Sequence, residues 1–94
     1  MAVDIKEIQC EFEGRRFYLK VISSDYDYIL EVVPEGFPPG FYMEALAQDT
    51  CAIIIDSLRR YASFEKLLNL VQKKPDGTPA SLIGAIILHL AENQ

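Results

Sequence analysis

The chain has 94 residues, with 14 acidic and 9 basic side chains and a formal net charge of −5. A chain of this length builds one domain around one core, and burial of about two-thirds of the unfolded surface is typical. Half of its residues are hydrophobic, which excludes an intrinsically disordered chain. The acidic surplus argues against binding nucleic acid through overall charge.

No apolar run reaches the roughly 18 residues that a membrane span needs. The first residues, Met-Ala-Val-Asp-Ile-Lys, lack the apolar stretch of a signal peptide. The sequence therefore predicts a cytoplasmic protein with no membrane partner.

Two strands, at 3–12 and 15–23, are predicted around a tight turn at Glu13-Gly14. A two-residue loop there places the apolar residues of both strands on one face and opposite charges across the other face. The expected pairs are Phe12 with Arg15, Cys10 with Phe17, Ile8 with Leu19, Glu11 with Arg16, Gln9 with Tyr18, and Glu7 with Lys20. A slip of one residue would expose the apolar set, so this register is strongly specified.

A third strand is predicted at 26–33, where aromatic and β-branched residues are concentrated. A loop at Ser24-Asp25 would fold it back antiparallel onto the second strand. The expected pairs are Val21 with Tyr28, Leu19 with Leu30, and Phe17 with Val32. This register turns Tyr18, Ile22, Ile29 and Val33 to the outer face, where such a contiguous apolar group indicates a partner.

The segment 34–41 is a loop rich in proline and glycine, in which Phe37 and Phe41 flank two consecutive prolines. Two interpretations stay open. The aromatic rings plug the edge of the core where the chain passes from sheet to helix, or they meet a partner.

Three helices are predicted at 42–61, 63–73 and 79–92, because the apolar period changes from two to about 3.6 residues. Ser63 is expected to cap the second helix, and Thr78 followed by Pro79 is expected to begin the third. In the first helix the apolar stripe that should lie against the sheet comprises Leu46, Thr50, Ile53, Ile54, Ser57, Leu58 and Tyr61, widened by Cys51 and Ile55.

The last helix is apolar nearly all round. A helix of this kind is either central to a core or covered by another chain, and a terminal helix of a small domain is rarely central. We therefore expect a homodimer that uses this helix. The candidate interface residues are Ile83, Ile87, Leu90, Tyr18, Ile29, Phe37 and Phe41.

Candidate catalytic groups are sparse. His89 is the one histidine, and the two cysteines, Cys10 and Cys51, form neither a disulfide framework nor a zinc motif. Two carboxylate pairs, Glu11 with Glu13 and Asp25 with Asp27, match no calcium loop, and the five glycines match no Walker loop or dinucleotide fingerprint. No catalytic residue, cofactor or metal is expected. The predicted helix at 79–92, which would be the recognition helix of a DNA-binding motif, lacks the basic side chains that DNA binding needs.

The sequence thus predicts an α+β fold, a three-stranded antiparallel meander of order 1-2-3 with three helices packed mainly on one face. The leading function is a small non-catalytic protein–protein interaction or regulatory module that self-associates through its last helix. An alternative is an acidic inhibitor or nucleic-acid mimic that docks on a basic partner. A third is a small-ligand or thiol-enzyme site around Cys51, Tyr28 and His89.

Overall fold

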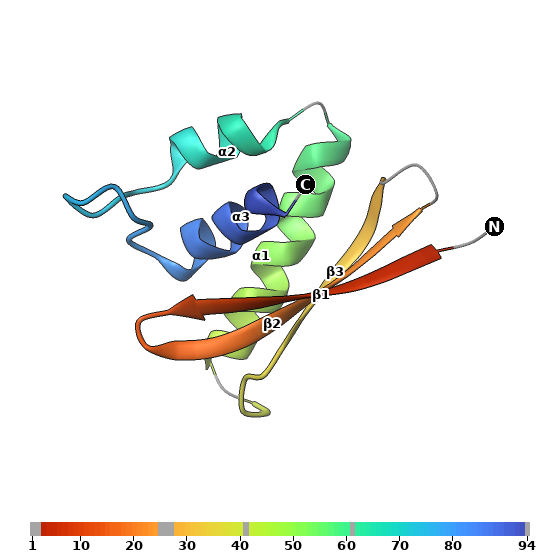
Figure 1. Ribbon diagram of the computed structural model, residues 1–94, viewed down its shortest axis with the longest axis horizontal. Coiled ribbons are helices and arrows are strands. Elements are labelled where there is room, and N and C mark those ends of the chain that lie inside the picture. Colours follow the sequence, from red (N-terminus) through yellow and green to blue (C-terminus); the bar gives the residue numbers. More distant parts are fainter. Residues whose placement is uncertain (1–2, 25–27, 41, 61, 94) are drawn as a thin grey trace.

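The computed structural model describes residues 3–24, 28–40, 42–60 and 62–93. Three antiparallel strands in the order β1-β2-β3 are followed by three helices, which confirms the predicted α+β fold (Figure 1). The elements are β1 (Val3–Phe12), β2 (Arg15–Ser24), β3 (Ile29–Glu35), α1 (Tyr42–Arg59), α2 (Phe64–Leu70) and α3 (Leu82–Glu92).

The β1–β2 hairpin has the register that the sequence predicts, from Phe12 opposite Arg15 to Glu7 opposite Lys20. The two turn residues, Glu13 and Gly14, have φ angles of 53° and 75°. Positive φ at both central residues is the mark of a turn whose twist matches that of the flanking strands. The hairpin is therefore specified both by its turn and by its apolar face.

The predicted β2–β3 register is wrong by four residues. Val21 lies opposite Val32 instead of Tyr28, and Leu19 lies opposite Pro34. The strand runs on through Pro34 because an edge strand tolerates proline where the missing N–H would face away from the ladder. An even shift keeps Val32 on the core face. The predicted start of the strand lies outside the described residues.

A bulge interrupts the β2–β3 ladder between Ile22 and Ser23. Ile22 lies opposite Glu31 and Ser23 opposite Ile29, so Leu30 is the extra residue of β3. The bulge changes the side to which the preceding residue points. Ile29, expected on the outer face, is half-buried against the core instead.

One face of the sheet carries the helical layer, with α1 packed against β3 and α3 against β1, while α2 packs on α3 (Figure 1). The side chains with the least exposure are Phe17, Leu19, Ile86, Leu90, Cys10 and Cys51. The last helix is thus central to this core, against the expectation that a terminal helix would be covered by another chain. The helix α3 is central because α2 covers the side of it that the sheet and α1 leave uncovered.

The second helix is capped as predicted, with the Ser63 hydroxyl accepting a 3.1 Å hydrogen bond from the Lys66 N–H. It ends at Leu70, three residues earlier than predicted. The last helix begins at Leu82, and its cap is Ser81, whose hydroxyl accepts from the Gly84 N–H at 3.2 Å. The prediction of a cap at Thr78 is wrong.

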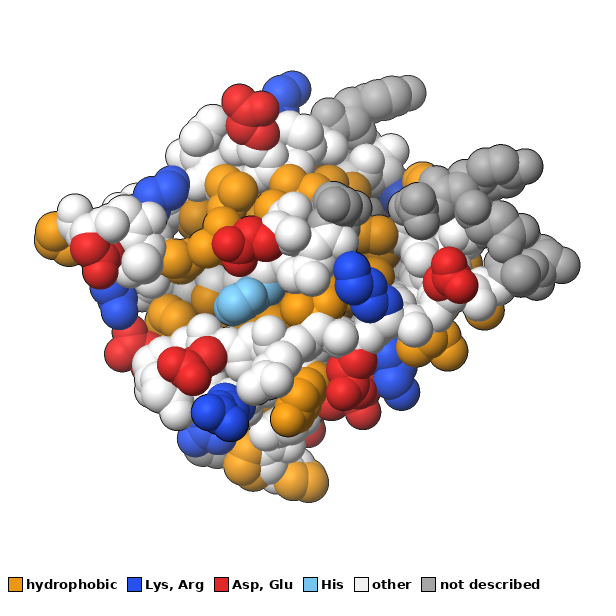
Figure 2. All heavy atoms as spheres, viewed as in Figure 1, with side chains coloured by type: hydrophobic (Ala, Val, Ile, Leu, Met, Phe, Trp, Pro, Cys, Tyr) orange, Lys and Arg blue, Asp and Glu red, His pale blue; other side chains and the backbone are white. Residues whose placement is uncertain are grey.

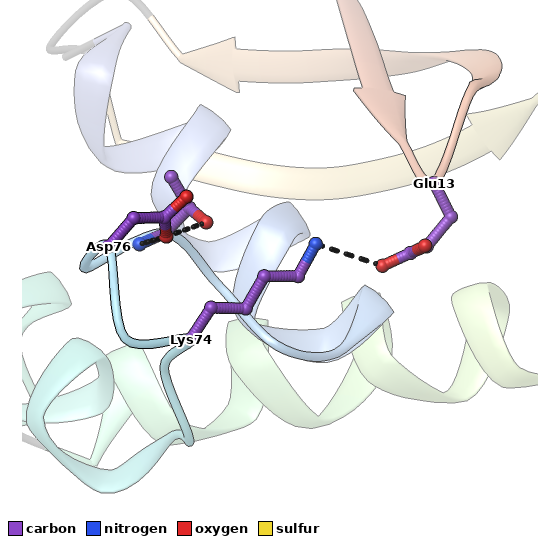
Figure 3. A network of polar contacts seen from close by, with 4 residues as sticks. Glu13, Lys74 and Asp76 are labelled. Atoms are coloured by element: carbon purple, nitrogen blue, oxygen red, sulfur yellow. Dashed lines mark hydrogen bonds and ion pairs between the residues drawn. The ribbon is translucent and has the colours of Figure 1, made fainter.

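The reason lies in the segment between the two helices, where Lys73 and Pro79 form an antiparallel bridge. The Thr78 hydroxyl donates to the Asp76 carboxylate at 2.6 Å, so it serves this turn and not the helix (Figure 3). Hydrogen bonding from Thr78 lowers the pKa of Asp76. Lys74 extends from the same turn to Glu13 at 3.1 Å and joins it to the tip of the hairpin (Figure 3).

Candidate interaction surface

The two thiols lie in the core beneath the sheet, Cys10 on β1 and Cys51 on α1. Both are free, and burial raises the pKa of each to about 12, with a smaller contribution to Cys51 from the neighbouring Cys10. A thiol with so high a pKa stays protonated at neutral pH, whereas nucleophilic attack requires the thiolate. These side chains act as small hydrophobic residues.

His89 lies near the end of α3, and its Nδ1 is 3.9 Å from a carboxylate oxygen of Glu92. No hydrogen bond joins His89 to Cys10 or Cys51 among the described residues. Within the same residues there is no group of three histidine, cysteine or acidic side chains that could hold a metal ion. Among the described residues, the geometry therefore places His89 beside Glu92 at the end of the helix and joins it to neither thiol.

The candidate residues in and near the sheet divide between core and surface. Tyr18 lies on the open face of the sheet and keeps 38% of its surface exposed. Phe37 is buried, with its ring centroid 5.1 Å from that of Phe17, so it plugs the edge of the core. Phe41 lies outside the described residues. Ile29 packs on the core as described above, which leaves Tyr18 as the exposed member of this set.

The candidates on α3 divide in the same way. Leu90 is fully buried and Ile87 is 3% exposed, so neither can reach a partner while the chain is folded. Ile83 keeps 39% of its surface exposed. The apolar character of this helix is therefore explained mainly by burial within one chain, and Ile83 is the residue left for contact.

Ile83 lies in a groove of about 210 Å³ where α1, α2 and α3 meet. Aliphatic side chains from all three helices line it, among them Ile53, Ile54, Leu67, Leu70, Val71 and Ile83. Ile53 is 65% exposed and Leu70 is 77% exposed. Figure 2 shows hydrophobic side chains at the surface in the region of α2 and α3, with charged side chains around them. We call the groove that these aliphatic residues line the three-helix groove.

Two charged residues lie one helical turn from residues that line the three-helix groove. Helical spacing places Asp49 one turn before Ile53 on α1, and Lys66 one turn before Leu70 on α2. Neither Asp49 nor Lys66 forms an ion pair with another described residue. An acidic residue thus lies one turn from a groove residue of α1, and a basic residue lies one turn from a groove residue of α2.

Sequence reasoning missed two of the exposed groove residues. Ile53 belonged to the stripe that was expected to lie against the sheet, but the stripe is wider than the area that the sheet covers. Leu70 was assigned to no face. The available signal was the density of leucines in α2, at 67, 68 and 70, which exceeds what one buried face of a seven-residue helix needs.

A second hollow, of about 460 Å³, lies between the free edge of β3 and α1. Its lining includes Glu31, Asp56 and Arg59 beside apolar residues. The Arg59 guanidinium donates a 2.9 Å hydrogen bond across this hollow to the carbonyl oxygen of Leu30. The Leu30 carbonyl at the edge of β3 is thus already engaged by the chain itself.

Fold and surface together define a small α+β domain with an exposed aliphatic groove. No family model matches the chain, and no curated protein or solved structure matches it either. No helix among the described residues combines the length and apolar character that crossing a membrane requires.

Proposed function

We propose that the protein is a non-catalytic protein-interaction module that binds the apolar face of a partner's helix in the three-helix groove. The observation that carries the proposal is the exposure of Ile53, Leu70 and Ile83, one aliphatic residue from each helix, around one depression. Burying such a side chain is worth about 1.5–3 kcal/mol relative to leaving it in water. A groove between helices that is lined by aliphatic residues is a common receptor for an amphipathic helix.

The charges at the groove support a helical partner over a purely apolar one. Asp49 on α1 and Lys66 on α2 would meet opposite charges on the polar borders of an amphipathic helix. Such pairs fix the direction of the bound helix while the aliphatic contacts supply the affinity. We place the module in the cytoplasm, since two buried free thiols are ordinary in a reducing compartment.

The acidic-inhibitor alternative has less support. On the open face of the sheet, Glu11 lies 3.9 Å from Arg16 and Glu35 lies 3.6 Å from Lys20. These pairs dilute the negative field that a phosphate-mimicking surface needs.

The test is site-specific photo-crosslinking in the native cell, with a benzophenone side chain in place of Ile83. The control carries the same group in place of Tyr42, which is 74% exposed at the beginning of α1. We expect one discrete adduct with a second protein from position 83, abolished by the additional change Leu70→Glu, and none from position 42.

Equal labelling from both positions, or no adduct from position 83, would contradict the proposal. An adduct of twice the chain mass would show that the groove receives a second copy and would also overturn the proposed partner class.

A further inference from the structure

Within the described residues, the outer edge of β1 is unpaired along its whole length. The two-residue loop makes Phe12 and Arg15 a hydrogen-bonded pair, and such pairs recur at every second residue of an antiparallel ladder. The even-numbered residues of β1 therefore point their N–H and C=O groups to β2. The odd-numbered residues, Val3, Ile5, Glu7, Gln9 and Glu11, point theirs away from the sheet, where no described strand follows.

The first half of this edge is accessible from both faces. Every residue from Val3 to Glu7 is exposed, with Val3 at 50% and Ile5 at 64%. Within the described part of the chain, no hydrogen bond from outside the sheet reaches the backbone of Ile5 or Glu7. The register of β1 has neither a bulge nor a proline. A long regular edge of this kind is a template for another strand.

We propose that two copies of this chain pair antiparallel through residues 3–7 of β1, with Ile5 opposite Ile5 of the second copy on the two-fold axis. The other pairs are then Asp4 with Lys6 of the second copy and Val3 with Glu7 of the second copy. Because the contact is two-fold, each of the latter occurs twice. The odd-numbered residues of both copies supply the hydrogen bonds, and the two sheets become one sheet of six strands.

Charge selects this register over its neighbours. A two-fold axis at Lys6 would put two lysines directly opposite each other, and an axis at Glu7 would do the same with two glutamates, and like charges at such positions are destabilising. The axis at Ile5 instead pairs Asp4 with the lysine of the other copy. Asp4 forms no ion pair with another described residue, so it is available for this contact.

The open face of the sheet favours the same register. Ile22 of β2 lies directly opposite Ile5 of β1 and is half-buried on that face. Pairing at Ile5 therefore aligns four isoleucines across the six-stranded sheet, Ile22 and Ile5 from each copy. The exposed Ile5 side chain, which already has Ile22 on one side, then gains an apolar neighbour on the other side, which explains an aliphatic residue that is otherwise 64% exposed.

The test is disulfide trapping at the two-fold axis. In the proposed pair the two Cα atoms of residue 5 lie about 5.5 Å apart, within the range of about 4.4–6.8 Å that a disulfide spans. We expect Ile5→Cys to form a covalent dimer under mild oxidation. Glu7→Cys is the matched control, because its two copies would lie about 13 Å apart, four residues along the strands.

Each outcome either distinguishes between registers or rejects pairing through the β1 edge. Trapping of Glu7→Cys in preference to Ile5→Cys would overturn the register, and trapping of neither would overturn the pairing. The unchanged protein measures the background, since burial raises the pKa of Cys10 and Cys51 to about 12 and keeps both thiols out of exchange. The inference is independent of the three-helix groove, so a groove variant such as Ile83→Glu should bind no partner and still dimerise.

Discussion

The two edges of the sheet are treated in opposite ways. At β3, Pro34 removes an N–H that would face outward, Leu30 forms a bulge, and the Arg59 side chain occupies the carbonyl of that bulge at 2.9 Å. At β1, ten regular residues run without proline or bulge. Proteins block exposed edges because each is a site for unwanted pairing.

This difference indicates that self-association is prevented at the β3 edge and permitted at the β1 edge. Three separate devices at one edge and none of them at the other indicate that the open edge is kept for a partner strand.

The change Phe17→Ala should destabilise the whole sheet, and with it both of its edges. Phe17 lies on the central strand, is fully buried and contacts the Phe37 ring. Loss of a buried phenylalanine costs about 3–5 kcal/mol, a large part of the stability of so small a domain. Chemical denaturation measures it. Tyr18→Ala, the neighbouring position on the open face, should cost far less, and equal losses would contradict the assigned faces.

High pH should destabilise the core that supports both edges. The pKa of Cys10 and Cys51 is about 12 in the folded chain, against an ordinary value of 9.0, so the folded state retains protons that the unfolded state loses. Stability should therefore fall as the pH rises from 9 towards 12, by about 1.4 kcal/mol per pH unit for each thiol. Denaturation midpoints across this range, compared with those of Cys10→Ala, measure it. An unchanged slope in the variant would contradict the shift.

Proline substitutions should distinguish the two sides of β1. In Lys6→Pro the missing N–H is one that pairs with Val21 of β2, and leaving its partner unsatisfied costs about 1–3 kcal/mol. In Gln9→Pro the missing N–H faces the free edge, so the stability of the monomer should change little. Thermal unfolding compares them. The reverse order would mean that the outward residues have been assigned to the wrong side.

Arg59→Met should remove one of the three features that block the edge of β3, at a small cost in stability. The substitution keeps most of the aliphatic stem and removes the donor to the Leu30 carbonyl, a hydrogen bond worth about 1 kcal/mol. Because Pro34 and the bulge stay in place, association through β3 should then rise only slightly, as a minor fraction of species heavier than a dimer. The control Arg60→Met removes only an exposed ion pair with Asp56 and should produce none. Identical behaviour of the two variants would contradict the proposal that Arg59 hinders association through β3.

The parts of the fold that the sequence predicted are those with local determinants. The β1–β2 register follows from the Glu13-Gly14 turn and from alternation on both strands. The β3 register depends on an edge that tolerates Pro34 and on a bulge at Leu30, and neither is visible before the neighbours are known. The beginning of α3 was misplaced for a similar reason, since Thr78 bonds Asp76 in a turn.

The candidate surface was predicted less well. Burial of Ile87 and Leu90 depends on α2 covering α3, which the composition of α3 alone does not indicate. Ile83, which the sequence offers as an interface residue, keeps 39% of its surface exposed, and its role in binding stays a prediction. Ile53 and Leu70 were not offered as interface residues, because the apolar stripes of α1 and α2 are wider than the surfaces available to bury them.

The solution mass across a dilution series tests the central claim, that the open β1 edge pairs two copies, most directly. The unchanged chain should rise from 10.6 kDa towards twice that mass between micromolar and millimolar concentration. Ile5→Pro, which removes an outward N–H within the overlap, should stay at the monomer mass, while Gln9→Pro, outside the overlap, should dimerise like the unchanged chain. A monomer at every concentration, or a dimer that Ile5→Pro leaves intact, would contradict the account.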